Sequence, residues 1–256
     1  MGTLPPSLAV ELPYESNPSV TELGHTTATE RDLYRALKDE ARKIAARFQR
    51  PISVLDICAA SGGAAWHIGS AVRYRRLVLV DMDPLMCEAA RKRSWGTEDV
   101  EIVLADAVEW RGSEPFDLIL ANSAYHHIQD DRKTAFLMNL AAQLAPGGNI
   151  LVGEHFLPDY ADGDIESYRR SVQGFYEARV AALQEAGDAP GAIEVIRQTG
   201  RYCWERRYEY QVSRHVFVRH LAATGLRARS WKRIWPAESG VLPEDSGSYL
   251  ISLALH

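Results

Sequence analysis

The chain has few cysteines and no long apolar run, and each absence excludes a class of protein. Its three cysteines, Cys58, Cys87 and Cys203, lie too far apart in the sequence for a disulfide framework or a paired metal site. No apolar run approaches the roughly 20 residues that cross a bilayer, and the first residues lack the basic and apolar regions of a signal peptide. We therefore expect a cytoplasmic protein with no membrane partner.

An excess of positive charge is also missing. The 256 residues carry a formal net charge of −5, whereas a general nucleic-acid binder usually has a basic face. We therefore expect no nucleic-acid partner. The length suits one large α/β domain with an elaboration, and 46% apolar content is ordinary for a globular protein. The sequence leaves open whether the protein is a monomer or a homodimer.

A buried strand, a run of small residues and a helix follow one another near the start of the chain. Residues 52–58 form an apolar, β-branched run, which predicts a buried parallel strand. Small residues follow as far as Gly63, and a helical pattern runs from about residue 64 to residue 72. This order opens a doubly wound nucleotide-binding fold, in which small residues let backbone N–H groups approach the ligand.

A second apolar run, residues 77–81, ends in Asp81, 19 residues after Gly62. In nucleotide-binding folds, a carboxylate at the tip of the second strand accepts hydrogen bonds from ribose hydroxyls, and the expected gap is about 20 residues. The small-residue turn and the acid at this spacing together indicate a ligand that contains a nucleoside.

The remaining pattern alternates strands and helices and then changes. Further strands are expected at 100–104, 116–122, 149–155, 228–235 and 249–255, and helices at 29–48, 84–93, 131–144, 165–186, 192–198 and 213–224. We predict an α/β fold with a doubly wound, Rossmann-like, mostly parallel seven-stranded sheet, an antiparallel last strand and a helical lid insertion. Its expected parts are an irregular N-terminal arm (1–28), a cofactor-binding core (29–155), the lid (156–212) and a C-terminal helix and strand hairpin (213–256).

From Ile52 to Glu154 the chain resembles the class I S-adenosylmethionine-dependent methyltransferases. Asp56 matches the acid of the family's first motif and Gly62 its third glycine, while Cys58 and Ala60 stand where the first two glycines would be. Further resemblance is found at residues 80–84, 105–107, 116–122 and 144–148. The resemblance implies a methyltransferase with S-adenosylmethionine as its cofactor.

The resemblance also implies a cofactor site. Asp81 would bind the ribose, Met82 would contact adenine, Asp106 would accept from the adenine amino group, and Gly62 would lie at the methionine end. The complete predicted set is Asp56, Ala59, Gly62, Asp81, Met82, Asp106, Ala107 and Asn122. The alternative for Asp81 and Asp106 is a purely local role in capping helices or turns.

Candidates for acid–base chemistry follow the fourth and fifth strands. Tyr125, His126 and His127 come after the fourth strand, and His155 follows Glu154 at the end of the fifth. Histidine can take a proton near neutral pH, although such histidines can also serve only in packing. Because the spacing of these groups does not imply a metal geometry, we expect no metal.

The substrate is the least determined part of the prediction. Between Arg197 and Arg233 ten basic residues occur with only two acids, which favours a lid that closes over a planar or acidic small molecule. The predicted substrate-binding residues are Tyr14, Tyr125, Glu154, Arg206 and Arg207. We expect methyl transfer to a small natural-product-like acceptor; the alternatives are a nucleic-acid methyltransferase and a protein that binds S-adenosylmethionine without methyl transfer.

Overall fold

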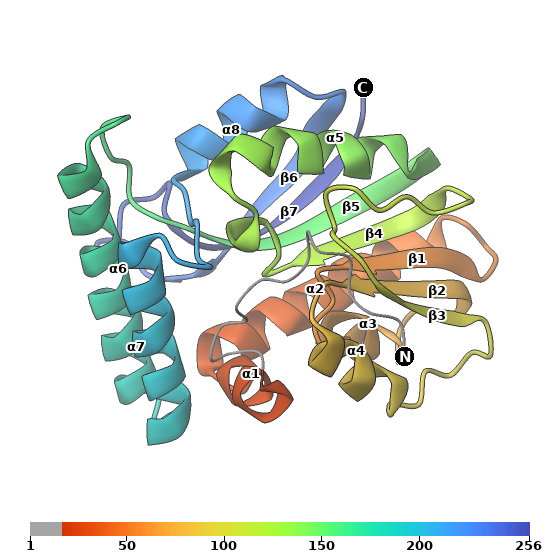
Figure 1. The fold of residues 1–256 in the computed structure, drawn as a ribbon, viewed down its shortest axis with the longest axis horizontal. Helices are drawn as coiled ribbons and strands as arrows, with labels where there is room; N and C mark the ends of the chain where they lie inside the picture. Colours follow the sequence, from red (N-terminus) through yellow and green to blue (C-terminus); the bar gives the residue numbers. More distant parts are fainter. Residues whose placement is uncertain (1–16) are drawn as a thin grey trace.

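The computed structural model describes residues 17–256, so the predicted substrate contact at Tyr14 lies outside the described residues. One seven-stranded sheet organises the molecule, in the order β3-β2-β1-β4-β5-β7-β6 (Figure 1). Its strands are β1 (Ile52–Ile57), β2 (Tyr74–Asp81), β3 (Val100–Leu104), β4 (Phe116–Asn122), β5 (Leu144–Phe156), β6 (Leu226–Trp235) and β7 (Gly247–Leu255). β7 pairs antiparallel with both β5 and β6, and the other strand pairs are parallel. The predicted fold class is confirmed.

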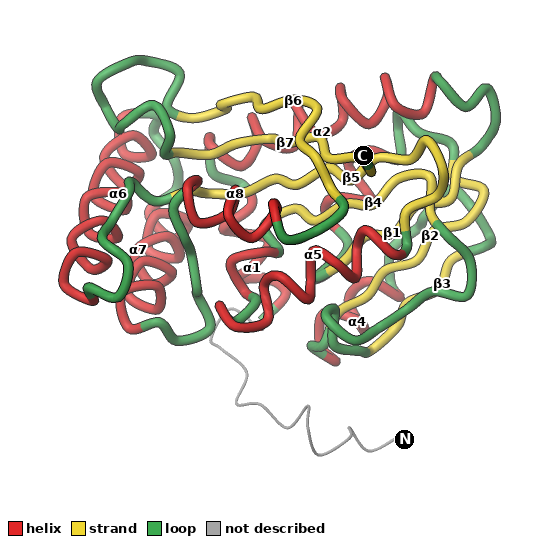
Figure 2. The backbone as a smooth tube through the Cα atoms, turned by 90° about the horizontal axis from the view of Figure 1, so that it is seen from above, coloured by secondary structure: helices red, strands yellow, loops and turns green. Residues whose placement is uncertain are grey.

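Helices cover both faces of the sheet (Figure 2). One face packs against α2 (Ala28–Ala46) and α3 (Gly63–Ile68), and the other against α5 (Lys133–Ala142) and α8 (Arg214–Ala222). The strands between them are apolar on both sides, so β1 and β4 are buried along their whole length. The strand order reverses between β1 and β4, and this switch point is where such sheets bind ligands beyond the carboxyl ends of their strands.

A helical hairpin stands beside the sheet (Figure 1). It consists of α6 (Ile165–Glu185) and α7 (Pro190–Glu205), which share an apolar cluster that includes Phe175 and Ile196. The predicted helix at 192–198 is therefore too short. The observed helix α7 begins with proline in its first turn, where the missing N–H costs nothing. It ends before Arg206, which adopts a left-handed conformation.

The expectation of an irregular arm over residues 1–28 is wrong for its described part. Pro18–His25 forms the helix α1, because the Asn17 side chain accepts a hydrogen bond from the Ser19 N–H and proline follows at the first helical position. This helix packs against α7, since a side-chain carbon added at Gly24 would lie 3.2 Å from Val195. The segment is therefore attached to the helical hairpin.

The remaining helix, α4 (Pro84–Arg91), begins as the sequence predicted, with Asp83 accepting from the Leu85 and Met86 N–H groups and proline at the first position. Over residues 17–256, no helix has the length and the apolar character needed to span a membrane.

Candidate functional site

The turn between β1 and α3 keeps a glycine-type backbone although two motif glycines are missing. Cys58, Ala60 and Gly62 have φ angles of 52°, 47° and 82°, in the left-handed region. A side chain there costs about 1–2 kcal/mol, and small residues keep the backbone accessible. The turn that the sequence predicted therefore forms with cysteine and alanine at the first two glycine positions.

Asp81 lies at the carboxyl end of β2, next to this turn. Its two carboxylate oxygens accept from the Ala60 N–H at 2.7 Å and the Asp83 N–H at 2.9 Å. Burial raises the pKa of the Asp81 carboxyl to about 6. Each oxygen retains a lone pair, so the group fits the predicted role of accepting hydrogen bonds from ribose hydroxyls. Met82 follows it and is half-buried.

Asp56 lies beneath the turn and is fully buried in the middle of the sheet. Its carboxylate accepts from the Ala65 N–H at 3.0 Å, so it fixes the start of α3. Burial raises the pKa of this carboxyl to about 7. The structure therefore gives Asp56 a role in holding the turn. Ala59, within the turn, is buried.

Asp106 and Ala107 follow β3. Asp106 accepts from the Val108 N–H and from the guanidinium of Arg132, both at 2.8 Å. The Ala107 carbonyl accepts from the amide of Asn139 at 2.9 Å. The sequence analysis missed Arg132, which lies in a short turn of helix before α5.

Asn122 ends β4 and lies over Gly153 of β5. A side-chain carbon added at Gly153 would lie only 3.0 Å from the Asn122 Cγ, so the glycine makes room for the amide. The Asn122 Oδ1 is buried and has no hydrogen-bond partner within residues 17–256. A buried acceptor of this kind suits a donor on a ligand, as the predicted role in cofactor binding requires.

His126 lies in the short 3-10 helix η3 (Tyr125–His127) after β4. Its Nδ1 is 2.6 Å from the Glu154 Oε1, and its backbone N–H donates to the Glu154 Oε2 at 3.1 Å. Glu154 is fully buried; although burial raises its pKa, the charge and hydrogen bond of His126 bring the pKa below its ordinary value. Glu154 is therefore an ionised acceptor that orients the imidazole, and in the neutral form of the ring the lone pair lies on Nε2.

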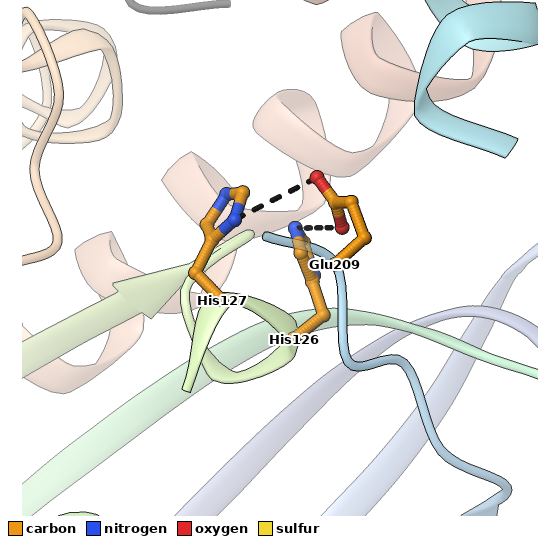
Figure 3. A group of neighbouring side chains, drawn as sticks. All are labelled: His126, His127 and Glu209. Atoms are coloured by element: carbon orange, nitrogen blue, oxygen red, sulfur yellow. Dashed lines mark ion pairs between the residues drawn. The ribbon is translucent and has the colours of Figure 1, made fainter. Parts of the chain in front are cut away.

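Glu209, in the segment between α7 and α8, lies opposite both histidines (Figure 3). One of its oxygens is 3.7 Å from the His126 Nε2 and the other is 3.6 Å from the His127 Nδ1. The Glu209 side chain is 2% exposed, whereas that of His127 is 44% exposed. Nothing in the sequence pattern marked Glu209, because it follows His127 by 82 residues.

Two predicted catalytic residues point elsewhere. Tyr125 is buried against Phe217 in the core, and its hydroxyl is 2.6 Å from the His220 Nδ1. The 3-10 turn directs Tyr125 into the core, so the prediction that it meets the substrate is wrong. Glu154 is fully buried and accepts from the His126 imidazole and from two backbone N–H groups, so here it orients His126, and its contact with a substrate stays a prediction.

His155 is also unavailable for catalysis, because both ring nitrogens are used. Its Nδ1 lies 2.7 Å from the Ser248 hydroxyl and its Nε2 lies 2.8 Å from Glu30. Burial lowers the pKa of His155. Glu30 in turn contacts Arg179 of α6 at 2.6 Å. The group is a buried polar network that joins α2, β5 and the helical hairpin.

The structure does not bring the two predicted arginines into one substrate site. Arg206 forms an ion pair with Asp130 and stacks over the Tyr168 ring, 4.6 Å from its centroid. Arg207 is exposed and lies over the Tyr208 ring at 5.2 Å. The ion pair with Asp130 compensates the charge that was predicted to bind an acidic substrate.

Comparison with known proteins relates this chain to methyltransferases. Residues 54–148 match the family model described as "Methyltransferase domain". No curated protein matches the sequence. Among solved structures, the plantazolicin methyltransferase BpumL, in complex with a monoazolic desmethylPZN analog and SAH, has a TM-score of 0.62 at 12% identity over 93% of this chain and 89% of its own.

Two further structures share the fold. The N-methyltransferase NodS from Bradyrhizobium japonicum WM9, in complex with S-adenosyl-L-homocysteine, has a TM-score of 0.52 at 15% identity over 97% of this chain and 94% of its own. The O-methyltransferase NcsB1 from neocarzinostatin biosynthesis, in complex with S-adenosylmethionine and 2-hydroxy-5-methyl naphthoic acid, has a TM-score of 0.56 at 15% identity over 94% of this chain. The chain spans about 60% of the NcsB1 chain and of the mitomycin 7-O-methyltransferase MmcR. Residues 54–148 therefore match a methyltransferase domain, and the chain shares the fold of these methyltransferases, as the motifs predicted.

Proposed function

We propose that this protein transfers a methyl group from S-adenosylmethionine to a small, protic acceptor of the natural-product type. The observation that carries the proposal is the pair of His126 and Glu154, which lies at the carboxyl ends of β4 and β5. Asp81 and the left-handed turn lie at the same edge of the sheet, on β2 and β1. A site for the nucleoside and a proton-accepting side chain thus share the edge at which such folds bind ligands.

When bound, S-adenosylmethionine supplies a methyl group whose bond to the sulfonium sulfur breaks as the bond to the acceptor atom forms, which leaves a neutral thioether. Asp81 would hold its ribose, the turn up to Gly62 would face its methionine part, and Met82, Asp106 and Asn122 would contact the remainder. These side chains would bind S-adenosylmethionine and orient it toward the acceptor. Orientation of this kind supplies roughly 7–11 kcal/mol toward the barrier of a reaction between two bound partners.

The acceptor must lose its proton when it is a hydroxyl or a protonated amine. Glu154 holds the Nδ1 proton of His126, so that Nε2 presents a lone pair toward Glu209. A positioned base contributes about 10²–10⁴-fold to the rate of such a step. The His126 side chain is 7% exposed, so bulk water has little access to the imidazole.

The helical hairpin formed by α6 and α7 is proposed to cover the acceptor. Support comes from the ion pair of Arg179 in α6 with Glu30 in α2, and from Glu209, which lies four residues after the end of α7. A covered site favours a compact acceptor over a nucleic acid, and the net charge of −5 agrees with that choice. Cytoplasmic location and a monomeric or homodimeric state belong to the same proposal.

Calorimetric titration with S-adenosylmethionine and, separately, with S-adenosylhomocysteine tests the proposal. We expect micromolar binding of both ligands and loss of binding in Asp81→Asn. Turnover is then screened with phenols and aromatic carboxylates. His126→Ala should lower kcat by about 10²-fold or more, whereas the control Tyr125→Phe, at a core position, should keep the wild-type kcat. Binding of neither cofactor form by the folded wild-type protein would refute the proposal, and binding without any turnover would favour a non-catalytic protein.

A further inference from the structure

His126, His127 and Glu209 form a cluster that the methyl-transfer scheme leaves incompletely used (Figure 3). One ligand atom from each residue lies within 4.8 Å of the other two, and the three side chains point toward one another. We infer that this cluster binds one divalent transition-metal ion, with both imidazoles and the Glu209 carboxylate as ligands. Two histidines and one carboxylate are a recurrent metal-binding set that leaves coordination positions open.

The distances fit an ion better than direct hydrogen bonds between the three groups. One Glu209 oxygen lies 3.7 Å from the His126 Nε2 and the other lies 3.6 Å from the His127 Nδ1, beyond hydrogen-bond length. The His127 Nδ1 lies 3.3 Å from the Tyr208 carbonyl oxygen, so its Nε2 is the nitrogen that remains for an ion. Ligand atoms that surround a zinc ion at about 2.0–2.1 Å are roughly 3.3 Å apart in a tetrahedral site. All three ligand atoms lie within 4.8 Å of one another, so the side chains would need to close by up to about 1.5 Å.

Charge supports the same assignment. The side chains of Glu154 and Glu209 are each 2% exposed, and His126 lies between them. Burying two carboxylates is costly unless positive charge or hydrogen bonds compensate for them. A divalent cation beside His126 would add positive charge next to both carboxylates, whose charges also act on the buried ammonium of Lys133.

Glu154 gives the cluster the outer support that metal sites commonly have. It accepts the Nδ1 proton of His126 at 2.6 Å, which turns the Nε2 lone pair toward Glu209. Histidine ligands usually donate their other N–H to a carboxylate in this manner, which fixes the ring and raises its basicity. The hydrogen bond from the Tyr210 N–H to the His126 carbonyl, at 2.6 Å, ties the Glu209 segment to the histidines.

The ligand set also indicates the ion and the acceptor. Imidazole nitrogens favour zinc and similar ions over magnesium, which prefers oxygen ligands. An open position would take the oxygen of a phenol or a hydroxy acid and would lower the pKa of that oxygen. With the His126 lone pair bound to the ion, the acceptor proton would leave to solvent water as the acceptor oxygen binds the ion. The choice of acceptor rests on the proposed function, whereas the ion site itself does not.

The test uses the full-length protein without a polyhistidine tag, dialysed against a chelator and then titrated calorimetrically with zinc chloride. We expect one zinc ion per chain, and weaker binding of magnesium chloride. Glu209→Gln keeps the shape of the side chain and should weaken zinc binding by at least tenfold, on the order of the loss known for altered metal sites. Glu205→Gln removes the same charge from an exposed position at the end of α7 and should keep the wild-type affinity.

A second readout is the visible absorption of bound cobalt(II), which should appear in the wild type and in Glu205→Gln and disappear in His126→Ala. Absence of zinc binding by the wild type would overturn the inference, as would equal affinities in Glu209→Gln and Glu205→Gln. Titration of the chelated protein with S-adenosylhomocysteine separates the two proposals, since binding there without any zinc binding would leave the proposed function standing and remove the ion site.

Discussion

Replacing Gly62 by alanine should destabilise the protein and weaken cofactor binding. The residue has φ of 82°, and a side-chain carbon added there would lie 2.6 Å from Leu79 and would meet the Trp95 ring more closely still. Left-handed backbone costs a residue with a side chain about 1–2 kcal/mol. Overpacking in a filled site typically costs a further 1–3 kcal/mol. The expected loss is therefore about 2–5 kcal/mol.

Gly96 offers a matched control for the backbone part of this loss. Its φ is 65°, and an added carbon would meet nothing within 4 Å. Gly96→Ala should therefore lose only about 1–2 kcal/mol. Urea denaturation followed by tryptophan fluorescence measures both variants, and equal slopes against urea concentration would show that the unfolded states are comparable.

The difference between the two variants isolates the contact with Trp95 and Leu79. We expect Gly62→Ala to lose about 1–3 kcal/mol more than Gly96→Ala, and to bind S-adenosylhomocysteine more weakly while Gly96→Ala binds as the wild type does. Equal losses of stability in the two variants would refute the argument, because they would show that the turn shifts freely to accept a side chain.

Two further predictions concern buried charge. Arg179→Met should lose about 3–5 kcal/mol of unfolding free energy, because Glu30 would remain buried without the Arg179 cation. In urea denaturation, the double variant Arg179→Met/Glu30→Gln should lose less than the sum of the two single variants. A loss equal to that sum would contradict the pairing. The pKa of Asp56 is raised by burial to about 7, so its contribution to stability is complete below pH ~4 and is lost as the pH rises through about 7, for a total on the order of 4 kcal/mol. Asp56→Asn should lack this decline between about pH 4 and 7. A parallel decline in both proteins would show that other groups cause it.

Some features that the sequence analysis missed still had a sequence signal. Asn17 followed by Pro18 is a cap and a first helical position, and it preceded α1 within a segment expected to be irregular. The low apolar periodicity of residues 1–28 concealed the signal. The directions of Tyr125 and His126 had no sequence signal, because the two residues are adjacent in the chain. Only the 3-10 turn places Tyr125 in the core and His126 next to Glu209.

The sequence by itself determined the order of strands and helices, the turn after β1 and the acid at the end of β2. These depend on interactions within short segments: apolar runs long enough for a buried strand, aspartate and proline at the start of α4, and small residues where the backbone must turn sharply. Asp81 could be predicted because a strand, a helix and a second strand fix its distance from the turn along the chain.

Only the tertiary structure decided which side chains meet at the far end of the site. Glu209 joins His126 and His127 across 82 residues, and Arg179 reaches Glu30 from another helix. No local pattern encodes such pairs, because each partner is buried by the packing of its own element and the distance between them depends on how the helical hairpin meets the sheet. The role of His126 therefore follows from Glu154 and Glu209, which the sequence shows only as separate acids.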